Sequence, residues 1–320
     1  MPETLLEEEK NLSTFKELLF KKLHKDPPTL FLSDIPQWSS FIKGMDLKKD
    51  EIGHLKTYLL NGFFYNFSSP LPSSSQIKEA LKESNHCDFI MIPLVRRNDE
   101  HRFLKELGFF EIPMFTESIL KLEPPLQNQL KKFAGSKQIK NLRRLSRYAQ
   151  EEFTLQIFKT SAFYENMKAQ RDFIALHKMN AFKYKHPLNL YDEESIDFLI
   201  KSPLRENIGC AIRYTKENHI PVQAALLFFD EKRRHIYVMC QGIDPLFQRP
   251  PQNLYMSLFF DLFSWAENHN YQEIHLGRGS LDIKKKLGCN IFYELFSFIK
   301  PLSNVGAHCL KNFLSSRNFL

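Results

Sequence analysis

The chain has 320 residues, of which 43% are hydrophobic, 25% charged and 13% aromatic, and its formal net charge at pH 7 is +7. A chain of this length and composition can bury a substantial core. We therefore expect one large domain or two domains of ordinary size, and we favour two. The five cysteines are widely spaced and include no CxxC pair, a pattern that favours neither a disulfide framework nor a zinc site, and we expect no metal.

The amino terminus, MPETLLEEEK, is acidic, whereas a secretory signal is basic and then apolar. The most apolar run, Leu254 to Ala266, is too short to cross a bilayer. Together with the odd number and wide spacing of the cysteines, these features predict a cytoplasmic protein without a transmembrane segment.

The first half of the chain predicts an α/β unit. Apolar residues at helical spacing predict a helix within residues 1–30, and Pro27-Pro28 ends it because proline removes a backbone donor. A helix from Gln76 to Ser84 and an apolar strand from Phe89 to Val95 follow. These signals divide the chain into a first domain at 1–126, a basic connecting helix at 127–150 and a second domain at 151–320.

The second half has a clearer pattern, which begins with a predicted helix from Ser161 to Asn180. A helix from Asn253 to His269 is apolar on nearly every side, which implies burial against a sheet. Before it, three runs rich in β-branched and aromatic residues predict an antiparallel meander: Ile208 to Tyr214, Val222 to Phe229 and His235 to Gln241. After it come a strand, a short helix and a last strand: Glu273 to Leu276, Leu281 to Leu287 and Phe292 to Ile299.

The positive charge is concentrated in one seventeen-residue window that contains no acid. Clustered cations attract polyanions, so this window could contact the phosphates of a nucleotide, a coenzyme or an RNA. The alternative is an ordinary solvated helix face. The residues concerned are Lys131, Lys132, Lys137, Lys140, Arg143, Arg144 and Arg147.

The β-β-β-α-β-α-β order of the second half resembles the GNAT acyltransferase fold, and more narrowly its FemAB-like branch with two GNAT-like units in tandem. The segment LGRGSLDIKKKLG, from Leu276 to Gly288, is similar to the closing motif of that branch. Gly242 to Pro245, Ser136 to Arg147 and Cys87 to Asn98 resemble its loop, basic helix and first-domain strand. The resemblance implies an α/β fold of two tandem GNAT-like domains, each a mixed, mostly antiparallel sheet flanked by helices.

The resemblance also implies acyl-CoA as co-substrate, held at the end of the third strand and the start of the long helix. A standard GNAT has a glycine-rich loop there, whose amides bind the pyrophosphate. Here the loop from Gln248 to Asn253 has no glycine and two prolines, so a cation could substitute for the amides. The candidate coenzyme-binding residues are Gln241, Gly242, Arg249, Gln252 and Asn253.

Transfer of an acyl group to an amine needs stabilisation of the developing oxyanion and an acceptor for the amine proton. By resemblance, Lys284 is the candidate for the oxyanion, although it could be a surface lysine in a KKK run. Arg278 lies between two glycines that allow close backbone approach, and its alternative is a salt bridge with Asp282 or Glu294.

Three residues are candidates for the proton acceptor: His275, Asp244 and Tyr255. The alternative for His275 is a satisfied core histidine, and catalysis by positioning alone, with water carrying the proton away, also remains open. His177 and Lys178 could meet the acceptor substrate or lie at the surface.

Three functions are compatible with these patterns. The first is an N-acyltransferase that moves an acyl group from acyl-CoA or a related thioester to an amine of a small molecule or cell-envelope precursor. The second takes the acyl group from aminoacyl-tRNA, as peptidoglycan-bridge members of the FemAB-like branch do, and it is motivated by the basic window. The third is a degenerate acyltransferase that acts as a binding module, motivated by the proline-filled loop.

Overall fold

In the computed structural model, which describes most of the chain, the residues form two compact units. Unit 1 consists of Met1–Phe115 and Tyr293–Leu320, and unit 2 of Thr116–Phe292. The described residues are 14, 17–18, 21–22, 29–31, 54–60, 68, 71–96, 102–183, 189–248 and 253–316.

These packing units do not follow the predicted segments. Residues 293–320 were placed in the C-terminal domain, yet they pack in unit 1, because the last strand pairs with the strand at Phe89–Arg96. The basic segment at 127–150 belongs to unit 2, where its apolar side contributes to the core.

Unit 1 contains the sheet order β1-β2-β3-β10, with α4 capped by a Ser73/Gln76 capping box. Helix Gln76 to Ser84 and strand Phe89 to Val95 are confirmed, whereas the predicted amino-terminal helix falls mostly outside the described residues. The elements are β1 (Thr29–Phe31), β2 (Lys56–Leu59), α4 (Ser74–Glu83), β3 (Phe89–Arg96), α5 (Arg102–Glu106), β10 (Ile291–Pro301) and α13 (Asn304–Ser316).

Unit 2 is built on strands in the order β4-β9-β8-β7-β6-β5. All neighbours are antiparallel except β8 and β9, which are parallel. The predicted meander is confirmed as β6, β7 and β8, while β4 and β5 were not predicted. The strands are β4 (Phe110–Lys121), β5 (Phe153–Phe158), β6 (Ile208–Thr215), β7 (Pro221–Asp230), β8 (His235–Ile243) and β9 (Glu273–Gly277).

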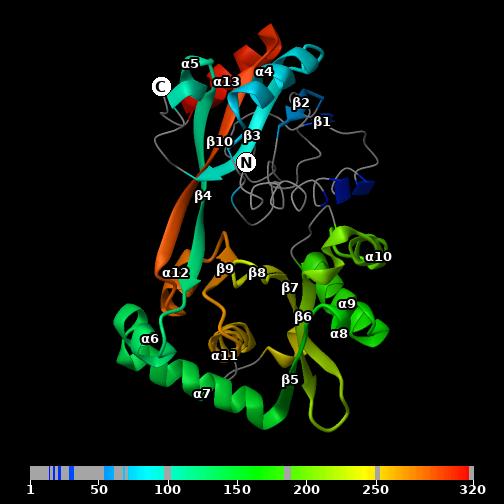
Figure 1. The fold of residues 1–320 in the computed structure, drawn as a ribbon, viewed down its shortest axis with the longest axis vertical. Helices are drawn as coiled ribbons and strands as arrows, with labels where there is room; N and C mark the ends of the chain where they lie inside the picture. The colour runs from blue at the N-terminus through cyan, green and yellow to red at the C-terminus, as the bar shows by residue number, and fades with distance from the viewer. Residues whose placement is uncertain are drawn as a thin grey trace. The chain divides into compact units, whose positions relative to one another are not determined.

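Helices cover both faces of the unit 2 sheet (Figure 1). On one face α11 and α7 share a core with Ala225 and Leu227 of β7. Successive residues of a strand point to opposite faces of the sheet. The residues of β7 that alternate with Ala225 and Leu227 therefore point to the other face, where α9 contacts both β7 and β8. The helices are α6 (Leu126–Ala134), α7 (Ser136–Glu152), α8 (Ser161–Tyr164), α9 (Met167–Lys183), α10 (Glu193–Lys201), α11 (Leu254–Asn268) and α12 (Leu281–Lys286), and two 3-10 turns are η3 (Pro203–Glu206) and η4 (Pro245–Phe247).

The single basic helix predicted at 127–150 is wrong in one respect, because Gly135 divides it into α6 and α7. Gly135 has a φ of +86°, which a residue with a side chain rarely adopts. The predicted helix from Ser161 to Asn180 is likewise divided into α8 and α9. In the part of the chain that the structure describes, no helix combines the length and the apolar composition needed to span a membrane.

A buried arginine fixes the start of α11. The guanidinium of Arg213 on β6 donates to Gln223 Oε1 at 3.0 Å and Ser257 Oγ at 2.7 Å, and it forms an ion pair with Asp261. Asp261 also accepts a hydrogen bond from Ser146 of α7. The network thereby holds α7 and α11 to the sheet.

Candidate functional site

Strands β8 and β9 separate after a short paired stretch. They pair in parallel only between His235–Tyr237 and Glu273–His275, although β8 continues to Ile243 and β9 to Gly277. The other edge of β8 pairs with β7 up to Ile243. The diverging parts of β8 and β9 therefore form a fork, which we define as residues 238–243 of β8 and 276–277 of β9.

A β-bulge lies at the base of the fork. Val238 pairs with Leu227 and Cys240 with Leu226, so Met239 is the extra residue on β8. A bulge bends its strand and is frequent beside active sites. Here the bulge follows directly after the last residue of β8 that pairs with β9.

Backbone amides of β8 point into the fork. The amide of Asp244 donates to the Val222 carbonyl of β7. Because successive amides of a strand point to opposite edges, the amides of Gln241 and Ile243 point away from β7, toward the fork. They could donate to an amide or carbonyl of an extended ligand.

Gly242 brings β8 into direct contact with α9. A Cβ at this position would lie 2.4 Å from the Leu176 carbonyl oxygen and 2.7 Å from the His177 nitrogen. His177 itself is buried and stacks on Phe173, with ring centroids 5.8 Å apart, so it belongs to the packing of α9 rather than to an exposed surface. Helix α9 thus forms one wall beside the end of β8.

Lys284 is buried and not part of an exposed lysine run. Its ammonium donates to the carbonyl oxygens of Gly277 at 2.8 Å and Arg278 at 2.7 Å. Burial lowers the pKa of Lys284 to about 8, although Cys289 and Glu117 oppose this shift. Lys284 therefore fixes the turn that follows β9.

The turn held by Lys284 needs glycine. Gly277 and Gly279 have φ values of 65° and 78°, in the left-handed region that glycine adopts without strain. Arg278 between them is half-buried, and its charge contributes to lowering the pKa of Lys284. Lys284 and Arg278 therefore lie in one structural group.

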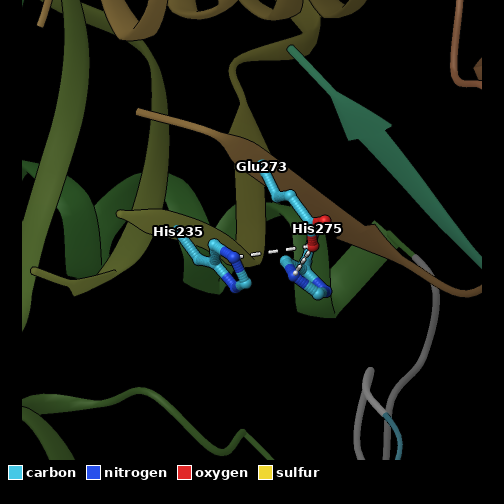
Figure 2. A group of neighbouring side chains, drawn as sticks. All are labelled: His235, Glu273 and His275. Carbon is cyan, nitrogen blue, oxygen red and sulfur yellow. Dashed lines mark ion pairs between the residues drawn. The ribbon is translucent and has the colours of Figure 1, made fainter. Parts of the chain in front are cut away.

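His275 lies at the last paired position before the fork, and both of its ring nitrogens face carboxylates. Nδ1 is 3.2 Å from Glu117 Oε1, and Nε2 is 3.4 Å from Glu273 Oε2. Tyr237 stacks on the ring at a centroid distance of 4.2 Å. His235 Nε2 lies 3.7 Å from the same Glu273 oxygen, and burial lowers the pKa of His235 (Figure 2).

The other described candidates have local structural contacts. The Asp244 carboxylate accepts from the Leu246 amide at 2.9 Å, and the Asn253 side chain caps α11 by accepting from the Met256 amide at 3.0 Å. The ring of Tyr255 packs edge-on against Phe259. Arg249 and Gln252 lie outside the described residues.

All seven basic residues of the predicted window are exposed, on α6 and α7. The opposite side of α7 is buried through Ile139, Leu142 and Leu145. We call the exposed cations the basic face: Lys131, Lys132, Lys137, Lys140, Arg143, Arg144 and Arg147.

Three members of the group around His275 were not predicted from the sequence: Glu117, His235 and Glu273. Glu117 lies on β4, which was not predicted, and 158 residues separate it from His275. The alternation of Glu273 and His275 on one predicted strand was a signal that they share a face.

Comparison with known proteins supports the fold. No family model matches the chain, and no curated protein matches its sequence. Among solved structures, L-PGS from Bacillus licheniformis is 13% identical with a TM-score of 0.56, and it covers 87% of this chain and 95% of its own. FemX is 12% identical with a TM-score of 0.53, and the match covers 81% of this chain and 83% of the FemX chain.

A third similar structure is a domain described as the C-terminal domain of a lysylphosphatidylglycerol synthetase from Agrobacterium fabrum. It is 9% identical with a TM-score of 0.55, over 81% of this chain and 82% of its own. At these identities the likeness concerns the fold. The chain therefore shares the α/β fold of L-PGS and FemX, and the fold expected from the resemblance to the FemAB-like branch is confirmed.

Proposed function

We propose that this protein is an acyltransferase that holds its acyl donor in the fork between β8 and β9. The observation that carries the proposal is the divergence of the two strands after Tyr237 and His275, with a bulge at Met239. Inward amides at Gln241 and Ile243 suit an extended donor arm, which would lie along β8 as an added strand. The likeness to L-PGS and FemX supports a transferase of this class.

In the proposed reaction, the acceptor nitrogen, or the hydroxyl oxygen of phosphatidylglycerol, attacks the carbonyl carbon of the donor. The bond from that carbon to the thiol sulfur or the tRNA oxygen breaks, and the proton lost by the acceptor ends on the released thiol or hydroxyl. Positioning the two reactants supplies much of the rate enhancement. Asp244 directly follows β8 and also accepts a hydrogen bond from the Leu246 amide; it is our candidate for the proton acceptor. Lys284 acts as a positioning residue, because its ammonium is directed to the Gly277 and Arg278 carbonyls.

Two donors are proposed, both of which a cytoplasmic enzyme would meet. The first is acyl-CoA or a related thioester, with transfer to an amine of a small molecule or cell-envelope precursor. The second is aminoacyl-tRNA, and it is favoured by the exposed basic face of α6 and α7, since seven cations could neutralise phosphates. The lysylphosphatidylglycerol synthetase likeness adds phosphatidylglycerol to the acceptors worth testing.

A turnover assay tests the proposal. Purified protein is incubated with acyl-CoA or aminoacyl-tRNA and with a panel of amines or phosphatidylglycerol vesicles, and labelled product is measured. Gln241→Pro removes the amide that points into the fork, whereas Gln241→Ala keeps it. We expect turnover in wild type and Gln241→Ala, and at least tenfold less in Gln241→Pro. A folded wild type with no turnover on either donor supports the binding-module alternative instead.

A further inference from the structure

We propose that His235, Glu273 and His275 bind a divalent transition-metal ion, with zinc as the best match (Figure 2). The site lies beside the base of the fork, on the paired part of β8 and β9. The metal site is independent of the proposed function. It uses side chains from the part of β8 and β9 that is paired, whereas the proposed function uses the backbone amides of Gln241 and Ile243 beyond that part.

Strand pairing places the three side chains on one face. His235 pairs directly with Glu273, and Tyr237 pairs with His275. Glu273 and His275 are two residues apart on β9, so their side chains emerge on the same side. The intervening residues, Ile236 and Ile274, point the other way into the core with α11. The sheet therefore fixes the three donors without any rearrangement of the backbone.

The distances from Glu273 to the two histidines are close to those in a tetrahedral zinc site. Zinc binds histidine nitrogen at about 2.0–2.1 Å and carboxylate oxygen at about 2.0–2.2 Å, so ligand atoms at the corners of a tetrahedron lie about 3.4 Å apart. Glu273 Oε2 lies 3.4 Å from His275 Nε2 and 3.7 Å from His235 Nε2. One ligand atom from each residue lies within 4.8 Å of the others.

Glu117 supplies the outer contact that a metal-binding histidine needs. Ligating histidines usually donate their second N–H to a carboxylate or carbonyl, which fixes the tautomer and the ring orientation. The Nδ1 of His275 lies 3.2 Å from the fully buried carboxylate of Glu117. In the tautomer with hydrogen on Nδ1, Nε2 carries the lone pair and is available to bind the ion; its distance to Glu273 Oε2 is 3.4 Å.

Exposure gives the ion a path of entry. The side chains of His235 and Glu273 are 18% and 22% exposed, whereas those of His275 and Glu117 are 4% and 0% exposed. The ion would enter from the side of His235 and Glu273, and water would complete its coordination. Bound there, it would hold β8 to β9 at the last rungs before they separate.

Zinc binding to the 320-residue chain tests the site. The protein is treated with a chelator, dialysed and titrated with Zn²⁺ by calorimetry, and its thermal unfolding is measured with and without the ion. We expect one Zn²⁺ per chain and a higher melting temperature. His235→Ala and Glu273→Gln should abolish saturable binding, and Glu117→Gln should weaken it by about 10–100-fold.

His269→Ala is the matched control, because His269 is an exposed histidine of the same unit that donates no ligand to the site. Circular dichroism establishes that each variant is folded. We expect His269→Ala to bind Zn²⁺ as wild type does. The proposal is overturned if the folded wild type binds no Zn²⁺ or prefers Mg²⁺, or if His235→Ala binds Zn²⁺ as tightly as wild type and His269→Ala do.

Discussion

Gly242 of β8 lies directly against Leu176 of α9, so closely that a Cβ on residue 242 would be 2.4 Å from the Leu176 carbonyl oxygen. The contact is between two backbones, and neither can yield as a flexible side chain can. The position of α9 beside the end of β8 therefore depends on the absence of a side chain at residue 242.

Gly242→Ala should consequently destabilise the protein. Overpacking of a tight contact costs about 1–3 kcal/mol, and the strand must shift to accommodate the methyl group. The free energy of unfolding in urea measures the loss. Gly279→Ala is the comparison, because a Cβ there meets nothing within 4 Å and the cost is only that of its positive φ. Equal stability of Gly242→Ala and wild type would contradict the packing.

Arg213→Met should be more damaging than a typical core substitution. It leaves Asp261 buried without its cation, and breaking such a pair costs about 3–5 kcal/mol. Urea unfolding measures the change. The double variant Arg213→Met with Asp261→Leu removes both charges and should recover much of the stability. If the double variant is no more stable than Arg213→Met, the ion pair is not the source of the loss.

Lys284 should make stability rise in alkaline solution. Its pKa is about 8 in the folded protein, below the ordinary value of 10.5, because burial disfavours the charged form. Between these two values the unfolded state binds more protons than the folded state, so the free energy of unfolding increases with pH. The increase should be absent from Lys284→Met. Unfolding curves of both proteins from pH 7 to 10.5 test this, and identical pH profiles would be the contrary result.

The basic face should govern any binding of tRNA. If it contacts phosphates, replacing Lys137, Lys140 and Arg144 with alanine should lower the slope of log affinity against log salt by about 0.7–0.9 for each lost contact. Filter binding at several salt concentrations measures the slope. Replacement of three exposed lysines of unit 1, Lys78, Lys82 and Lys311, should leave it unchanged. Equal slopes in both triple variants would show that the basic face is only a solvated surface.

Local sequence patterns predicted much of unit 2. The three strands of the meander alternate or carry continuous apolar runs, and α11 is apolar on nearly every side, so their identity is encoded in short windows. Strand β4 escaped prediction, since its burial pattern does not alternate regularly and Pro113 interrupts it. The break at Gly135 depends on a single φ value within a strong helical pattern.

The candidate site was harder to predict than the fold. The motif from Leu276 to Gly288 identified Lys284 and Arg278. It did not predict that the ammonium of Lys284 donates to the carbonyls of Gly277 and Arg278 in the turn after β9. The group around His275 depends on strand register, which joins Glu117, His235 and Glu273 from three strands. Register is a tertiary property, and no window of a single sequence contains it.

Hydrogen–deuterium exchange of the fork tests the central claim most directly. The exchange of the amides at residues 240–243 is measured in the free protein, then with acetyl-CoA and with aminoacyl-tRNA. If the donor lies along β8, one of these donors should slow exchange at Gln241 and Ile243 by at least tenfold, without a comparable change in β5 at the far edge of the unit 2 sheet. Unchanged exchange at both amides with either donor at saturation would contradict the account.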